Sequence, residues 1–260
     1  VCMYTLYFIP DACSLAIHSI LNELDQPLTL IHKQDAAEFA QLNPVQTVPV
    51  LVDEGEVLCE GAAILLHLLD KHDNRLLPRS GAPRQRAIEQ MLLANATVHP
   101  AYGRLFFIDG VLQRETARHQ AFVAAAAQIS ALWQALETRL QGQPYLGGEH
   151  VSAADFLLAV YYRWGALFPV EIETGPRARA MVERVLARDG TLVVFKASDT
   201  PSRVHPLQIW KTSFVSDEFH AAQPEGEGLL GRVGNRDLVR GISDAYTLVN
   251  LATREQVTRQ

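Results

Sequence analysis

The chain has 260 residues, 48% of them hydrophobic and 20% charged, and its formal net charge at pH 7 is −6. This is the composition of an ordinary globular protein, so intrinsically disordered and fibrous classes are excluded, and an acidic chain without a basic stripe argues against non-specific nucleic-acid binding. At roughly 100–200 residues per domain, the length allows one large domain or two modest ones.

The first 72 residues are predicted to form a small α/β unit. Residues 4–8 are rich in aromatic and branched side chains, which is typical of a strand, whereas residues 13–24 place apolar side chains near helical spacing. An acidic turn at residues 53–56 separates two short apolar runs and predicts a β-hairpin. The predicted order β-α-β-α-β-β-α runs over residues 4–8, 13–24, 28–31, 35–42, 49–52, 57–58 and 60–72.

The second half of the chain is predicted to be helical. Residues 73–83 are polar and turn-rich, which predicts a linker between two domains. Ser152 and Asp155 fit the capping box that often begins a helix. The predicted helices cover residues 84–108, 115–141, 152–166 and 176–188.

The C-terminal 70 residues are less regular. Residues 192–195 fit either a strand or a buried turn, and residues 242–256 fit a last helix. We therefore treat residues 191–260 as an extension whose structure the pattern leaves open.

Cysteine content and apolar run length point to a cytoplasmic protein. Three cysteines are too few for a disulfide framework, which favours a reducing compartment. Apolar runs fall far short of the roughly 18 residues that span a bilayer, and we recognise no signal peptide. We expect no membrane partner.

The start of the first helix holds a candidate chemical site. Cys13, followed by Ser14, stands where free backbone N–H groups and the helix dipole place partial positive charge. Such a position favours a thiolate or another bound anion. The alternative is that Cys13 is a small half-buried residue at a helix start, and spacing alone does not separate the two interpretations.

Two further positions are candidates for ligand binding. Pro49 opens the third strand, either as an ordinary trans residue or as a cis residue that aims the backbone of Val48 at a ligand. Glu60 and Gly61 stand at the start of the third helix, where free N–H groups bind a carboxylate. The alternative for this pair is a simple helix cap.

Together these motifs resemble those of the glutathione transferase family, and of its bacterial beta class most closely. Residues 12–18 read Ala-Cys-Ser-Leu-Ala-Ile-His, with Ile17 where the family often has Pro. Residues 43–51 carry the Asn-Pro-x-x-x-Val-Pro-x-Leu segment, and residues 60–64 carry the acid-Ser-x-Ala-Ile box with Gly61 in place of Ser. The similarity covers roughly residues 3–190.

The resemblance implies an α/β thioredoxin-like N-terminal domain and an all-α C-terminal helical domain. It implies a glutathione-binding domain at residues 1–76 and a helical domain at 84–190, with the extension 191–260 beyond them. In the family the proline of the second motif is cis, and the loss of a side-chain hydrogen bond at Gly61 implies weakened glutathione binding. The implied catalytic residues are Cys13, Ser14 and His99, and the implied glutathione-binding residues are Thr47, Val48, Pro49, Glu60 and Gly61.

The implied activity is conjugation of the glutathione thiolate to small hydrophobic electrophiles in bacterial detoxification. Glutathione is the expected co-substrate, no metal is expected, and the expected assembly is a homodimer. Because Cys13 can form a mixed disulfide with glutathione, a thiol-disulfide reductase or dehalogenase is an alternative. A non-catalytic binding or regulatory protein is a third, suggested by Gly61 and the extension.

Overall fold

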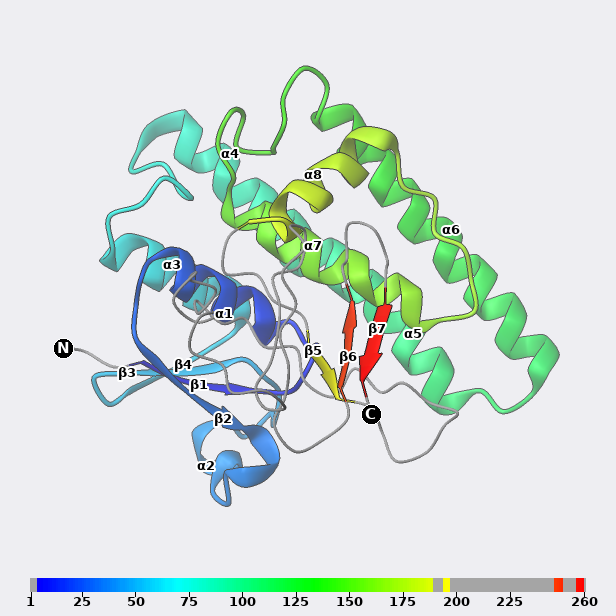
Figure 1. Ribbon diagram of the computed structural model, residues 1–260, viewed down its shortest axis with the longest axis horizontal. Helices are drawn as coiled ribbons and strands as arrows, with labels where there is room; N and C mark the ends of the chain where they lie inside the picture. The colour runs from blue at the N-terminus through cyan, green and yellow to red at the C-terminus, as the bar shows by residue number, and fades with distance from the viewer. Residues whose placement is uncertain (1–3, 189–193, 197–245, 250–255, 260) are drawn as a thin grey trace. The chain divides into compact units, whose positions relative to one another are not determined.

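The computed structural model describes residues 4–188, 194–196, 246–249 and 256–259 (Figure 1). Contacts within the chain divide it into two compact units, residues 1–64 with 186–260 and residues 65–185. The division falls inside the helix α3 (Gly61–Lys71). The domain boundaries implied by the sequence, at residues 76, 84 and 190, stay predictions.

The first unit contains the alternating strands and helices that the sequence predicts. The order β-α-β-α-β-β-α is confirmed, with one short 3-10 turn added at Lys33–Asp35. The elements before α3 are β1 (Tyr4–Phe8), α1 (Ser14–Glu23), β2 (Leu28–His32), α2 (Phe39–Leu42), β3 (Val50–Asp53) and β4 (Glu56–Cys59).

These four strands form one mixed sheet in the order β2-β1-β3-β4. β1 pairs in parallel with β2, whereas the pairs β1-β3 and β3-β4 are antiparallel. A parallel pair needs a crossover connection, which α1 supplies as it packs against β1 (Figure 1). Leu6, Ile17, Ile20 and Leu51 are fully buried. This arrangement is the thioredoxin-like α/β fold that the sequence implied.

The second unit is built from helices. A π-helix, Leu93–Val98, joins the first two of them, and a 3-10 turn, Gly165–Leu167, follows the fourth. The α-helices are α4 (Gly81–Leu92), α5 (His99–Val111), α6 (Glu115–Arg139), α7 (Ala153–Trp164) and α8 (Pro176–Leu186). The all-α domain expected from the sequence is confirmed.

The first long helix differs from the prediction at its start. It begins at Gly81, inside the stretch interpreted as a linker. Pro83 lies in its first turn, where a missing N–H costs nothing, so the same residue types that suggested a linker also begin a helix. The rest of the predicted linker, residues 73–80, is ordered by Asn74. Its side-chain oxygen accepts from the N–H groups of Leu76 and Leu77 at 2.9 and 3.1 Å.

The helix α7 is the most buried helix of this unit, and its start is built as predicted. Ser152 and Asp155 form the capping box, with the Ser152 N–H donating to Asp155 Oδ2 at 2.8 Å and the Ser152 hydroxyl at 2.7 Å. The other carboxylate oxygen accepts from the Leu146 N–H at 3.0 Å. Asp155 thus ties the preceding loop to the helix that it caps.

The described part of the extension is β structure. The strands β5 (Val194–Lys196), β6 (Tyr246–Val249) and β7 (Gln256–Arg259) form an antiparallel sheet in that order. The strand alternative at residues 194–195 is therefore confirmed. The helix expected over 242–256 is wrong where the chain is described, because Tyr246–Val249 is a strand rich in residues that favour strands.

Candidate functional site

The predicted site segments of the first unit converge at one end of the strands of the four-stranded sheet. Because β1 and β3 are antiparallel, the end of β1 and the start of β3 lie together, and Tyr7 pairs with Val50. β3 and β4 are antiparallel too, so Val50 also pairs with Cys59 at the end of β4. The segments next to these ends contain Cys13, Ser14, Thr47, Val48, Pro49, Glu60 and Gly61.

Cys13 precedes the first residue of α1 and contacts the second segment directly. Its Sγ donates a hydrogen bond to the carbonyl oxygen of Val48 at 3.4 Å, across 35 positions of sequence. The side chain is half-buried. The structure thus joins the thiol to the residue before Pro49, a contact that spacing in the sequence could not show.

The environment of Cys13 keeps its thiol protonated. Burial raises the pKa of Cys13 to about 11, although the backbone N–H groups of Cys13 and Ser14 act in the opposite direction. The negative charge of Glu60 raises the pKa further. The N–H groups of the helix start favour the thiolate, as the sequence predicts, but desolvation outweighs them and the net pKa is raised.

Ser14 contributes to this region through its backbone. Its side chain is buried, and the hydroxyl donates to the carbonyl of Ile9 at 3.4 Å in the turn before the helix. The hydroxyl therefore stabilises the turn, while the N–H of Ser14 lowers the pKa of the neighbouring thiol. Any catalytic part that Ser14 plays stays a prediction.

The segment between α2 and β3 is held by Asn43. This residue is buried, and its Nδ2 donates to the carbonyl and the hydroxyl of Thr47 at 2.9 and 3.3 Å. Its Oδ1 accepts from the N–H of Val45 at 3.1 Å. The peptide bond between Val48 and Pro49 is cis, as the resemblance implied. Thr47 remains exposed and Val48 half-buried.

Glu60 and Gly61 form the start of α3. Glu60 is exposed and has a φ of 69°, a left-handed conformation that is uncommon for residues other than glycine and is often found at functional sites. Its carbonyl accepts from the N–H of Ile64 at 2.9 Å, the first bond of the helix. The N–H groups of the first turn have no partner within the helix, so this end suits a carboxylate.

His99 belongs to the second unit, where it lies among aromatic rings. Its imidazole stacks on Tyr161, with 4.9 Å between ring centroids and 11° between planes, and it contacts Trp164 at 5.3 Å. Burial lowers the pKa of His99, so the ring is neutral at pH 7. The predicted role of His99 beside a glutathione sulfur stays a prediction.

Sequence reasoning missed the aromatic side chains around His99. His99, Tyr102 and Phe106 recur at helical spacing and all contact Trp164. Phe106 is 44% exposed and packs edge-on against Phe168. The sequence did contain a signal for this cluster. Aromatic residues three and four positions apart lie on one face of a helix, and two such helices can pack these faces together.

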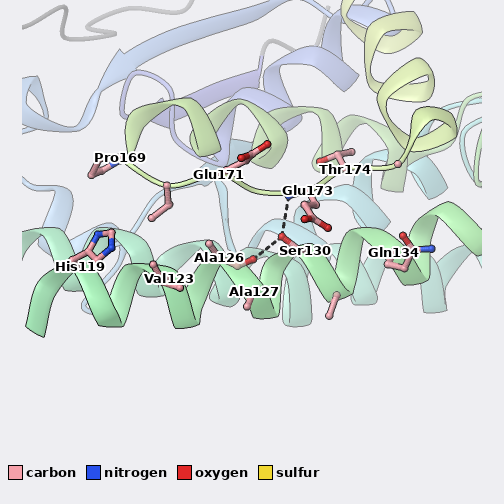
Figure 2. Close-up of a pocket in the computed structure, with 13 residues that line it drawn as sticks. His119, Val123, Ala126, Ala127, Ser130, Gln134, Pro169, Glu171, Glu173 and Thr174 are labelled. Carbon is pink, nitrogen blue, oxygen red and sulfur yellow. Dashed lines mark hydrogen bonds between the residues drawn. The ribbon is translucent and has the colours of Figure 1, made fainter.

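A separate hollow of about 790 Å³ lies between α6 and the segment 169–175 (Figure 2). Ser130 joins its two walls, donating to the Ala126 carbonyl at 2.8 Å and accepting from the Glu173 N–H at 2.9 Å. None of the site residues predicted from the sequence lines this hollow.

Among the described residues, no group of three or more His, Cys, Asp or Glu side chains could hold a metal ion. Likewise, no described helix could cross a membrane.

Two family models match the two parts of the chain in order. The glutathione S-transferase N-terminal domain matches residues 13–76, and the glutathione S-transferase C-terminal domain matches residues 98–189. Glutathione S-transferase GST-4.5 of Xanthomonas campestris pv. campestris is 31% identical over 188 residues, covering 70% of this chain and 92% of the relative. The chain belongs to the glutathione S-transferase family.

Other glutathione S-transferases are similar to this chain over the same share of its length. GstA of Escherichia coli O157:H7 is 27% identical over 194 residues, covering 70% of this chain and 92% of the relative. The structure of a glutathione S-transferase from Xylella fastidiosa is 29% identical, with a TM-score of 0.65, and covers 71% of this chain and 93% of that one. A sphingomonad glutathione S-transferase complexed with glutathione is 27% identical, with a TM-score of 0.62 and coverage of 71% and 93%.

The extension of this glutathione S-transferase matches another family model. Residues 183–260 match a family described as an ATPase involved in DNA repair. This range is less than a third of the chain and overlaps the end of the transferase C-terminal model. Most of it lies outside the described residues.

Proposed function

We propose that the protein conjugates the thiolate of glutathione to small hydrophobic electrophiles. The observation that supports this most is the arrangement at that end of the four-stranded sheet. There the Cys13 thiol contacts Val48, and the start of α3 follows the strand that pairs with β3. The sphingomonad relative, which holds glutathione, supports glutathione as the co-substrate.

The proposed binding mode uses backbone groups at each end of the site. The backbone of Val48, which lies in the segment before β3, pairs with the cysteinyl backbone of glutathione. The first turn of α3 at Gly61 holds the γ-glutamyl carboxylate, and the exposed carboxylate of Glu60 accepts from the γ-glutamyl amine. Thr47 and Pro49 shape the segment that presents Val48.

Cys13 then acts as a hydrogen-bond donor and not as the nucleophile. A thiol whose pKa is about 11 stays protonated at neutral pH, so it can turn its one hydrogen from the Val48 carbonyl to the sulfur of bound glutathione and stabilise that sulfur as a thiolate. Free thiols have a pKa of about 8.5, so a bound glutathione needs such help to ionise. A mixed disulfide would require the thiolate of Cys13, which burial disfavours.

Glutathione retention and conjugation test this proposal. We expect the protein to be retained on immobilised glutathione, to melt at a higher temperature with glutathione, and to conjugate a chlorinated nitrobenzene. Retention without conjugation would instead favour the non-catalytic binding protein. Absence of retention and of a thermal shift would reject both enzymatic functions.

The thiol-disulfide alternative has its own measurement. A reductase or dehalogenase that uses Cys13 gains the mass of one glutathione after incubation with oxidised glutathione, and Cys13→Ala abolishes that gain. Under the conjugation proposal the gain is small at pH 7. Cys59→Ala is the matched control, because Cys59 is also half-buried in the same unit.

We further propose a cytoplasmic homodimer with a role in detoxification. The family resemblance supports the assembly, and light scattering after gel filtration measures it. A mass of about 58 kDa is expected for the dimer, since one chain has a mass of 28.8 kDa. A monomer at micromolar concentration would contradict the proposed assembly while leaving the proposed chemistry open to its own test.

A further inference from the structure

The helix that carries His99 changes its geometry immediately before this residue. Pro100 has no N–H to donate four residues back, and its ring crowds the preceding turn. The chain accommodates it with the π-helix Leu93–Val98, and the N–H of His99 bonds to the carbonyl of Ala94, five residues earlier. A π-turn rotates the side chains that follow it relative to a continuous α-helix, and such turns are frequent at functional sites.

His99 then meets α7 through a face-to-face contact. The rings of His99 and Tyr161 are nearly parallel, at 11°, whereas the other ring contacts of His99 and of Tyr161, both with Trp164, are tilted at 50° and 43°. Tyr161 is fully buried, so its ring is a fixed surface. A parallel stack restricts the plane of the imidazole while leaving its two nitrogen atoms at the ring edge.

We propose that Tyr161 is a positioning residue, whose ring holds the imidazole of His99 in the plane in which it serves the reaction. This inference rests on the proposed function together with the role that the family resemblance implies for His99, beside the glutathione sulfur. In this proposal Tyr161 acts through His99 and not by contact with substrate. Its effect on turnover passes through His99, so the two residues must be coupled.

A double-mutant cycle tests that coupling. In the full-length chain, Tyr161→Leu removes the ring and should lower kcat about tenfold, because small displacements of a catalytic group cost rate more than binding. The KM for glutathione should change less than about twofold. In a His99→Gln background, Tyr161→Leu should lower kcat by less than about twofold, because the group that it positions is gone.

Two further variants separate positioning from stability. Tyr161→Phe keeps the ring and should recover most of the kcat that Tyr161→Leu loses. Tyr162→Leu is the matched control, because Tyr162 follows Tyr161 on the same helix but packs edge-on against Trp133 and not against His99. It should lower the melting temperature and leave kcat close to that of the unmodified chain. An equal loss of kcat from Tyr161→Leu with and without His99 would overturn the proposal.

The spectrum of the imidazole tests the stack even if conjugation is not detected. In the unmodified protein, the ring protons of His99 should resonate upfield of those of an exposed histidine, because they lie over the face of Tyr161. Tyr161→Phe should preserve this shift. Unshifted His99 protons in the unmodified chain would overturn the proposal. This measurement needs neither activity nor a folded Tyr161→Leu variant.

Discussion

At the scale of single residues, Cys13 shows how a local pattern and its surroundings can disagree. The position before a helix predicts an acidic thiol, since N–H groups and the helix dipole favour negative charge. The structure adds burial, which raises the pKa to about 11 and leaves the thiol donating to Val48. Burial dominates because the free energy of removing the thiolate charge from water exceeds the stabilisation that the helix terminus provides.

The reactivity of Cys13 follows from that raised pKa. In a chain carrying Cys2→Ser and Cys59→Ser, alkylation of Cys13 by iodoacetamide should accelerate continuously from pH 7 to pH 10, because the thiolate is the reactive form. The rate is read by mass spectrometry at each pH. Free glutathione in the same buffer is the control, and its rate should level off earlier. A plateau for Cys13 below pH 8 would contradict the burial argument.

His99 makes the stability of the protein depend on pH. Burial lowers its pKa in the folded chain below the ordinary value of 6.5, so the unfolded chain binds the proton more readily. The free energy of unfolding should therefore fall as the pH drops below 6.5 toward the folded pKa, and be fully restored above 6.5.

Urea unfolding at pH 7.5, 6.5 and 5.5 measures this dependence. His99→Gln should give a smaller loss of stability between pH 7.5 and 5.5 than the unmodified chain. His150→Gln, at an exposed histidine, is the control and should retain the full loss. Identical slopes for the unmodified chain and His99→Gln would show that His99 is not the group responsible.

At the scale of elements, two loops are organised by a single polar side chain each. Asn43 holds Thr47 and Val45 before β3, and Asp155 holds Ser152 and Leu146 before α7. The sequence motif predicted the capping box because its partners are three residues apart. It did not predict the contact with Leu146, nine positions earlier, since that depends on how the loop folds back.

Asn43 should matter for glutathione binding more than for turnover. Asn43→Ala releases the segment that presents Val48, so the KM for glutathione should rise about fivefold with kcat changed less than twofold, in keeping with the loss of hydrogen bonds worth about 1 kcal/mol each. Steady-state kinetics measures both constants. Gln41→Ala, at an exposed position of α2, is the control and should change neither. A change confined to kcat would argue against this role.

Asp155 should matter for folding. Asp155→Ala leaves the N–H groups of Ser152 and Leu146 without their acceptor in a buried place, which costs about 2–4 kcal/mol of unfolding free energy. Denaturant titration measures the change. Glu149→Ala, at an exposed position in the same loop, should stay within about 0.5 kcal/mol of the unmodified chain. A loss below about 1 kcal/mol for Asp155→Ala would show that water replaces the carboxylate.

At the scale of the whole molecule, we predict that the transferase fold does not need the extension. The N-terminal transferase model ends at residue 76 and the C-terminal one at residue 189, and the four-stranded sheet and the helices α1 to α8 lie within residues 4–186. A chain of residues 1–190 should therefore fold and be retained on immobilised glutathione like the full chain. Retention with an unchanged dissociation constant is the expected result. Loss of folding or of retention would make the extension part of the transferase.

The sequence alone determined the order of strands and helices in residues 4–71, the capping box of α7 and the family. Each of these depends on neighbours along the chain or on motifs of fixed spacing. Only the tertiary structure decided the protonation of Cys13, the contact between Cys13 and Val48, and the stacking of His99 on Tyr161. These depend on burial and on groups 35 or more positions apart, which no local pattern encodes.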